Sequence, residues 1–300
     1  MTYYSELFKS PEHIKHALDG VDYLCDDVIS TACFLAGSMA RPLYFEGEPG
    51  VGKTALAYAV STAFHLPLYR LQCYEGIDRS QALYDWDFRK QLFYLRLAQP
   101  EVGQGQTSLP AQLYDRSFLL ERPVLKALES APCVLLIDEV DRADDEFEAF
   151  LLEVLSDFAI TIPELGTIKP QTPPLVFLTS NRTREVHDAL KRRCLYHWVE
   201  HPDRIQEIAI LNRKCPGVER PMLEDMVAVA QRLRTKGLLK APGVSEVIDW
   251  ATSVHSLGIE RIDKRAMDLT IASLLKYKED QERVRENDYQ LVFAARDDQS

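Results

Sequence analysis

One eight-residue motif constrains this sequence more than any other feature. Residues 47–54 read GEPGVGKT and match the phosphate-loop pattern G-x-x-x-x-G-K-[ST]. A short apolar segment, 42–45, precedes the motif, and a helical segment, 55–64, follows it. The glycines let the loop N–H groups face phosphate oxygens, and the helix presents the positive end of its dipole to the same anion. An ordinary glycine-rich turn is the alternative, but such a match arises by chance in on the order of one chain per hundred of this length. The motif therefore predicts binding of a nucleoside triphosphate.

Each residue of the motif has an expected place around the nucleotide. We expect Lys53 to contact the β- and γ-phosphates and the Thr54 hydroxyl to bind Mg²⁺. The other residues expected to contact the nucleotide are Gly47, Glu48, Pro49, Gly50, Val51, Gly52 and Ala55.

A second motif, CVLLIDE at residues 133–139, predicts the catalytic acids. A continuous apolar run ending in an acidic residue is typical of a buried parallel strand whose carboxyl end carries chemistry. We expect Asp138 to bind the nucleotide's Mg²⁺, partly through water, and Glu139 to polarise a water against the γ-phosphate. The alternative is that the acidic stretch 138–148 is only the solvated start of a helix. That alternative fits Asp138 and Glu139 poorly, because they directly follow four aliphatic residues.

Two further positions lie at the ends of predicted elements. Asn181 ends the apolar segment 175–181, where its amide can bond both the attacking water and the γ-phosphate. Its alternative role is the N-cap of the following helix. Lys191, Arg192 and Arg193 close that helix, and the helix dipole alone also favours cations there. We predict that Arg193, assisted by Arg192, reaches the γ-phosphate of a neighbouring subunit.

Composition limits the other possibilities. A net charge of −11 and a pI near 5.2 argue against a protein that binds nucleic-acid backbones, which usually has a basic face. The N-terminal segment lacks an apolar core typical of a signal peptide, and the longest charge-free stretch, 28–40, is shorter than the ~20 residues that span a bilayer. The six cysteines form no C-x-x-C pair. We therefore expect buried free thiols and a cytoplasmic protein without a membrane partner.

The order of the predicted elements indicates the fold class. Strand-like and helical segments alternate up to about residue 200, and only helical segments follow. This predicts an α/β P-loop NTPase domain with a parallel sheet, residues 1–200, and a smaller all-helical domain, residues 201–300. A flexible tail is expected from about residue 283. Segment 80–99 is expected to be a helix with an irregular insertion.

Together these motifs resemble those of the AAA+ ATPases. The resemblance rests on GEPGVGKT, VLLIDE, FLTSN, KRRC and the helical C-terminal part, and it covers nearly the whole chain. Two insertions resemble those of the MoxR group. One is the aromatic helix-2-type insertion 72–98, and the other is ITIPELGTIK, 160–169, which reads as a β-hairpin before the strand carrying Asn181. These segments are most similar to the CoxD-like branch, which is associated with carbon monoxide dehydrogenase and related molybdenum hydroxylases.

The resemblance implies a Mg²⁺-dependent ATPase that assembles into a ring, usually a hexamer. The family's phosphate-loop, Mg²⁺, base and sensor-1 positions fall on Lys53, Thr54, Asp138, Glu139 and Asn181, and its arginine finger falls on Arg193. The resemblance also implies a chaperone that remodels or matures a metalloenzyme client, here a hydroxylase similar to carbon monoxide dehydrogenase. The usual partner of such a chaperone carries a von Willebrand factor A domain.

One feature departs from the family pattern. The family normally has an arginine near the start of a lid helix, in a G-x-S-x-R-like string, whereas PGVSEV at residues 242–247 has Glu246 and Val247 instead. Lys240 is the candidate substitute. We therefore expect the lid to be coupled to the nucleotide more weakly or differently.

The function predicted from these observations is ATP-driven remodelling of a protein client, with no nucleic-acid partner. One alternative is a nucleic-acid motor or loader. The acidic balance and the lack of a Lys/Arg stripe with interleaved aromatics argue against it. Another alternative is a slowly cycling, ATP-switched scaffold. The presence of both Glu139 and a candidate arginine finger favours turnover instead.

Overall fold

The computed structural model describes residues 4–97, 113–286 and 289–293. The chain divides into two compact units. Unit 1 comprises residues 1–17, 26–46 and 57–197, and unit 2 comprises residues 18–25, 47–56 and 198–300. Unit 2 thus contains the helical segment predicted from residue 201 onward and, in addition, the segment that carries the phosphate-binding motif.

A five-stranded sheet forms the centre of the α/β part. Its strands are β1 Leu43–Gly47, β2 Leu68–Gln72, β5 Val134–Asp138, β8 Leu175–Ser180 and β9 Leu195–Val199. The strand order is β2-β5-β8-β1-β9, and β2, β5, β8 and β1 pair in parallel. The carboxyl ends of β1, β5 and β8 therefore meet at one edge of the sheet, where open α/β sheets bind their ligands.

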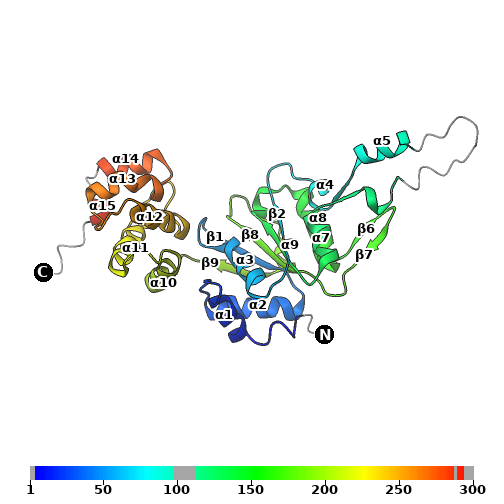
Figure 1. The fold of residues 1–300 in the computed structure, drawn as a ribbon, viewed down its shortest axis with the longest axis horizontal. Coiled ribbons are helices and arrows are strands. Elements are labelled where there is room, and N and C mark those ends of the chain that lie inside the picture. Colours follow the sequence, from blue (N-terminus) through cyan, green and yellow to red (C-terminus); the bar gives the residue numbers. More distant parts are fainter. Residues whose placement is uncertain (1–3, 98–112, 287–288, 294–300) are drawn as a thin grey trace, which may run out of the picture. The chain divides into compact units, whose positions relative to one another are not determined.

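The three central strands β5, β8 and β1 are buried because helices cover the sheet (Figure 1). Every residue of β1, β5 and β8 is buried, as expected for parallel strands made of continuous apolar runs. Apart from two helices within residues 79–97, the helices of this part of the described sequence are α1 Pro11–Asp19, α2 Asp27–Met39, α3 Lys53–Ala63, α7 Pro123–Ser130, α8 Asp145–Asp157 and α9 Asp188–Arg193. None of the six cysteines forms a disulfide bond, and five of them are buried, in agreement with the sequence prediction.

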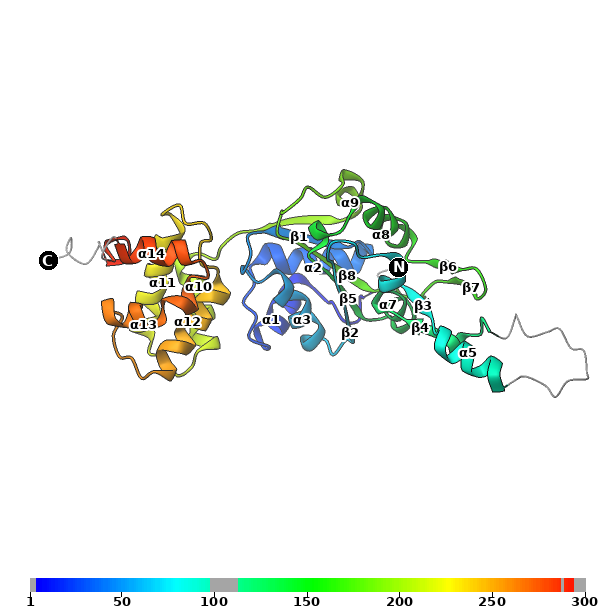
Figure 2. The ribbon, with the colours of Figure 1, turned by 90° about the horizontal axis from the view of Figure 1, so that it is seen from above.

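Two small sheets extend from unit 1. The predicted hairpin is confirmed: β6 Ile160–Ile162 pairs with β7 Gly166–Ile168 in antiparallel register. The expected helix over 80–99 is wrong in part, because α4 Arg79–Ala82 and α5 Phe88–Leu97 are separated by a strand, β3 Tyr84–Trp86. This strand pairs with β4 Leu119–Glu121. Figure 2 shows α5 standing clear of the main sheet.

Unit 2 is predominantly helical. Its helices are α10 Arg204–Lys214, α11 Arg220–Arg234, α12 Val244–Ser256, α13 Lys264–Leu274, α14 Lys278–Glu286 and α15 Gln290–Phe293. Their apolar faces form a core around the fully buried Trp250, whose Nε1 donates to Thr270 Oγ1 at 2.7 Å. Val284 and Val292 are buried in the same core, so packed helices continue beyond residue 283, where we predicted the tail to begin. The fold class predicted from the sequence, a P-loop-type α/β domain with a helical region after it, is confirmed.

Candidate nucleotide-binding and hydrolysis site

The phosphate-binding motif forms a loop between β1 and α3, and its glycines are required by the backbone. Gly50 and Gly52 have φ values of 80° and 96°, which favour glycine. Gly47 leaves no room for a side chain, because a Cβ there would lie 2.3 Å from the carbonyl oxygen of Val199. The loop conformation therefore follows directly from the motif.

Lys53 lies in the first turn of α3, with its ammonium inside the loop. Its Nζ donates to the carbonyl oxygens of Gly47 at 2.8 Å and Glu48 at 2.7 Å. Thr54 is half-buried in the same turn, whereas Glu48, Pro49 and Ala55 are exposed. The start of a helix is the place where backbone N–H groups and the dipole favour an anion.

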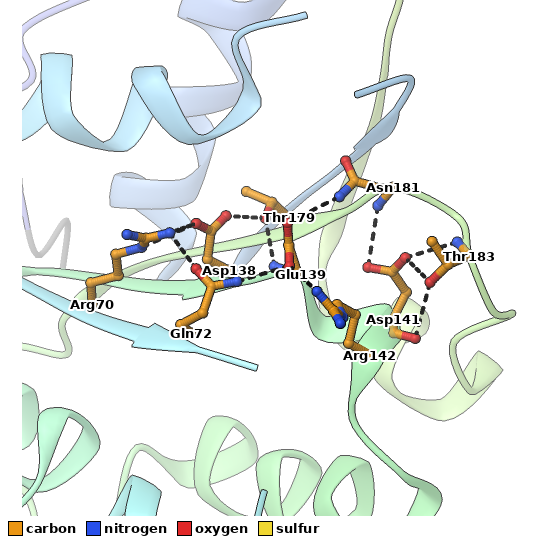
Figure 3. A network of polar contacts seen from close by, with 9 residues as sticks. All are labelled: Arg70, Gln72, Asp138, Glu139, Asp141, Arg142, Thr179, Asn181 and Thr183. Carbon is orange, nitrogen blue, oxygen red and sulfur yellow. Dashed lines mark hydrogen bonds and ion pairs between the residues drawn. The ribbon is translucent and has the colours of Figure 1, made fainter. Parts of the chain in front are cut away.

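Asp138 ends β5 with a buried carboxylate that two side chains hold in place. The Thr179 hydroxyl donates to Oδ1 at 2.5 Å, and Arg70 donates to Oδ2 through Nε at 3.1 Å and Nη2 at 2.6 Å. Figure 3 shows these contacts converging from β2 and β8 on the end of β5. Both oxygens of Asp138 therefore accept hydrogen bonds, as an ionised carboxylate does.

Glu139 follows in a left-handed conformation, with φ 55° and ψ 50°, and begins the short turn η2 Val140–Arg142. Gln72 Nε2 donates to Glu139 Oε2 at 2.9 Å, and Arg142 Nη1 lies 3.4 Å from the same oxygen. Asn181 Nδ2 donates to Oε1 at 3.4 Å. A non-glycine residue in this backbone region is uncommon and costs free energy, and such residues cluster at functional sites.

The structure brings Asn181 and Glu139 together through Asp141. Asp141 is buried and accepts from the backbone N–H groups of Asn181 at 3.2 Å and Thr183 at 2.8 Å, and from the Thr183 hydroxyl at 2.7 Å. These bonds fix the segment after β8 against the segment after β5 (Figure 3). Asn181 does not cap the next helix, because α9 begins only at Asp188. The alternative role of Asn181 as an N-cap is therefore wrong.

Arg192 and Arg193 end α9 with exposed side chains. Arg41 donates to their backbone carbonyl oxygens, at 2.6 Å for Arg192 and 3.1 Å for Arg193. The last carbonyls of the helix are therefore satisfied by another residue. Lys191 differs from its neighbours, because its Nζ lies 3.8 Å from Glu46 Oε1 and over the ring of Tyr44.

In unit 2, the start of α12 contacts the phosphate loop. The N–H groups of Val244 and Ser245 donate to the Gly50 carbonyl at 3.1 and 3.4 Å. Glu246 Oε2 accepts from the Gly243 N–H at 3.0 Å, and Lys240 Nζ lies 3.9 Å from Glu246 Oε1. Lys240 thus pairs with the residue that stands near the expected arginine position.

The residues present fit a magnesium ion bound together with phosphates. Among the residues that the structure describes, no group of three or more His, Cys, Asp or Glu could hold a metal ion. Mg²⁺ is usually bound by one or two carboxylates plus substrate phosphates and waters, so it needs no such group. The Asp138 carboxylate, buried in unit 1, and the Thr54 hydroxyl, half-buried in unit 2, are each a hard oxygen donor of the kind that this ion prefers.

Sequence reasoning missed six residues of this network: Arg70, Gln72, Asp141, Arg142, Thr179 and Thr183. Two of these residues could have been found from the segment LPLYRLQ, residues 66–72. Arg70 and Gln72 lie two residues apart in it and therefore on one face of β2. The structure shows that both reach the acidic residues at the end of β5.

Comparison with known proteins places the site in a family. Residues 43–199 match the family described as "ATPase family associated with various cellular activities (AAA)". The chain is also similar to "Uncharacterized protein SH1500" of Staphylococcus haemolyticus (strain JCSC1435), with 24% identity over 242 residues, 77% of this chain and 84% of that protein. No helix among the described residues is long and apolar enough to cross a membrane.

Proposed function

Because this chain belongs to the AAA family of ATPases, we propose that it binds ATP with Mg²⁺ and hydrolyses it to ADP and phosphate. The observation that carries this proposal is the pairing of Glu139 with Asn181 next to the buried Asp138, where β5 and β8 end side by side. A carboxylate and an amide at this edge are suited to hold and polarise one water molecule.

In this proposal each residue has a separate task. The loop N–H groups and Lys53 hold the phosphates, and Thr54 and Asp138 hold Mg²⁺, which when bound neutralises charge on the phosphate oxygens. Glu139 accepts the proton of the attacking water, and Asn181 orients that water. Replacing Glu139 by glutamine tests this assignment, because the variant should still bind ATP but should hydrolyse it far more slowly.

We further propose that hydrolysis requires a ring, of six subunits by family resemblance, with Arg193 acting on the neighbouring subunit's nucleotide. The exposed side chains of Arg192 and Arg193 support this role. Arg41 donates to the backbone carbonyls at the end of α9, so the side chains of Arg192 and Arg193 are not needed to satisfy these carbonyls. An arginine supplied from another subunit stabilises charge in the transition state and makes hydrolysis depend on assembly.

The work done with ATP is, in our proposal, that of a MoxR-type chaperone with a metalloenzyme client. Two features of unit 1 support a protein client: the hairpin β6–β7 and the exposed apolar residues of α5. Tyr84 and Trp86 of the same insertion pack against the core, whereas Phe88 and Phe93 are 61% and 64% exposed. In this proposal the exposed apolar side chains that gather on α5 favour contact with another polypeptide. The client that the resemblance favours is a molybdenum hydroxylase similar to carbon monoxide dehydrogenase.

The client proposal is tested by what changes the rate of ATP hydrolysis. We expect a von Willebrand A-domain partner or an immature hydroxylase to change the rate, and single- or double-stranded DNA to leave it unchanged at near-physiological salt. The net charge of −11 repels phosphate backbones, so any residual DNA affinity falls steeply with salt. Strong stimulation by DNA at that salt would favour the nucleic-acid motor instead.

A further inference from the structure

Arg70 is a charged residue in the middle of β2, the edge strand of the main sheet, opposite Leu136 of β5. Its guanidinium extends along the strand to the end of β5 and donates two hydrogen bonds to one oxygen, Asp138 Oδ2, at 3.1 and 2.6 Å (Figure 3). The Asp138 side chain is 4% exposed and the Arg70 side chain is 43% exposed. A buried carboxylate is thus paired with a cation that has room to move into solvent.

The charge of Asp138 lies in a buried position. Its Oδ1 accepts from the buried Thr179 hydroxyl at 2.5 Å, and that hydroxyl in turn accepts from the Glu139 N–H at 2.9 Å. An ionised carboxylate removed from water is costly unless a cation or further hydrogen bonds stabilise it. Arg70 supplies that cation at Oδ2.

The same carboxylate is the one expected to hold Mg²⁺. This ion keeps a strict octahedral shell of oxygen ligands and waters, so a carboxylate that holds it must offer free lone pairs to the ion or to its waters. A guanidinium that donates twice to Oδ2 uses the lone pairs of that oxygen. Arg70 and a metal shell that bound through Oδ2 would therefore compete for the same lone pairs.

We propose that Arg70 competes with Mg²⁺ for Asp138 and thereby sets the Mg²⁺ concentration at which this protein holds ATP. The inference rests on the proposed function, because it takes Asp138 as the residue that binds the nucleotide's metal ion. Arg70 acts here as a positioning residue: it stabilises Asp138 when no metal is bound and turns toward solvent when the metal shell forms. Its exposed side chain makes that movement possible without unfolding the strand.

A second ion pair in unit 1 provides a matched control. Arg184 pairs with Glu148, whose side chain is 2% exposed, while the Arg184 side chain is 37% exposed. The burial of the two partners thus closely resembles that of Arg70 and Asp138. Glu148 also accepts from the His187 N–H at 2.7 Å and lies on α8, outside the proposed metal site.

The test compares wild type, Arg70→Gln and Arg184→Gln. Binding of a non-hydrolysable ATP analogue is measured by calorimetry over a series of Mg²⁺ concentrations, which gives the Mg²⁺ midpoint for each protein. We expect the midpoint of Arg70→Gln to fall about tenfold, equivalent to about 1.4 kcal/mol, and that of Arg184→Gln to stay at the wild-type value.

Thermal unfolding is measured in parallel, with EDTA and with saturating Mg²⁺ and analogue. Arg70→Gln should lower the melting temperature more in EDTA than with Mg²⁺ and analogue, whereas Arg184→Gln should lower it equally in both.

An unchanged or raised Mg²⁺ midpoint in Arg70→Gln, with equal losses of melting temperature in both conditions, would show that Arg70 is only a structural partner. If Arg70→Gln does not fold, Arg70→Lys keeps the charge but loses the planar guanidinium, and its midpoint should fall by a smaller factor. A midpoint for Arg70→Lys equal to that of wild type would then overturn the inference. Wild-type protein that binds no analogue at any Mg²⁺ concentration would overturn the proposed function and this inference together. Normal wild-type binding with an unchanged variant would overturn the inference alone.

Discussion

The N–H of Val244, the first residue of α12, donates to the carbonyl oxygen of Gly50 in the phosphate loop at 3.1 Å. The contact brings Glu246 to the same loop, since a Cβ on Gly50 would lie 2.9 Å from Glu246 Oε2. The family resemblance calls for an arginine in this part of the helix, and a carboxylate has the opposite effect on a phosphate. At this place next to the phosphate loop, the chain therefore carries the negative charge of Glu246 where the family resemblance calls for the positive charge of an arginine.

The first prediction follows from that charge. Glu246→Gln keeps an oxygen that can accept from the Gly243 N–H and removes the negative charge, so ATP should bind about fivefold more tightly. A repulsion of about 1 kcal/mol is reasonable for two charges near a protein surface. The gain should shrink as salt is added. The control is Glu224→Gln on α11, where Glu224 pairs with Arg220 four residues earlier. Calorimetry that gives the same affinity for Glu246→Gln and wild type would contradict the prediction.

The second prediction concerns the ammonium of Lys53. Lys53→Ala should abolish measurable ATP binding, because it removes the positive charge expected at the β- and γ-phosphates. It also removes the bonds to the Gly47 and Glu48 carbonyls that hold the loop. Circular dichroism provides the control that the variant remains folded. Nucleotide affinity equal to that of wild type would show that this loop is not the binding site.

The phosphate loop illustrates what could be read from the sequence. Its glycines have positive φ or no space for a Cβ, and both constraints are local, so they are visible as sequence letters. The strand that carries Asp138 could also be predicted from the sequence, since a run of consecutive apolar residues ending in an acid is typical of a buried parallel strand. The family and fold class followed from these two motifs and their order.

The contacts between side chains could not be read in the same way. Arg70 reaches Asp138 only because β2 and β5 pair with Gln72 opposite Asp138, and a strand register is not written in either strand alone. Strand β3 was missed for a similar reason, because its partner β4 lies more than thirty residues further along the chain. Pairing with a distant segment outweighed the local helical pattern. The roles of Asn181 and Arg193 and the MoxR branch remain predictions.

The third prediction separates chemistry from binding. Glu139→Gln keeps the shape of the side chain but removes the base, so ATP should bind while hydrolysis falls by at least about a hundredfold. Binding is measured by calorimetry and turnover by phosphate release, and the trapped protein should accumulate as a ring in size-exclusion chromatography. Glu146→Gln, at the exposed start of α8, is the control and should hydrolyse ATP at the wild-type rate. A normal rate for Glu139→Gln would exclude Glu139 as the base.

The fourth prediction concerns pH. Burial, together with the nearby Arg234 and Lys53 cations and against the opposing Glu246 carboxylate, lowers the pKa of His201 to about 4. In the unfolded chain a histidine has a pKa near 6.5. Between about pH 6.5 and pH 4 the unfolded state therefore binds a proton at His201, whereas the folded state does not. The contribution of His201 to stability is therefore fully present above about pH 6.5 and is lost as pH falls toward 4.

Urea unfolding at pH 7 and pH 5 measures this effect. Wild type should lose more free energy of unfolding between these values than His201→Gln, by about 1 kcal/mol. One proton contributes at most about 1.4 kcal/mol per pH unit, and partial exposure of the imidazole reduces that value. Other groups titrate in both proteins, so the difference between the two isolates His201. Equal losses in wild type and variant would contradict the prediction.

The last prediction tests whether Arg193 acts across a subunit boundary. Arg193→Ala should bind ATP normally but hydrolyse it poorly, since the arginine stabilises charge in the transition state rather than the bound nucleotide. Arg220→Ala is the control, because Arg220 is an exposed arginine at the start of α11 and pairs with Glu224 on the same helix. If rings are the active form, the specific activity of wild type should also rise with protein concentration.

A mixing experiment gives the sharpest result. Rings that contain both Arg193→Ala and Glu139→Gln subunits should recover part of the activity, because some interfaces then combine an intact Glu139 with an intact Arg193. Mixed rings, verified by differential tagging, that show no recovery would mean that Arg193 acts within its own subunit or serves only the structure.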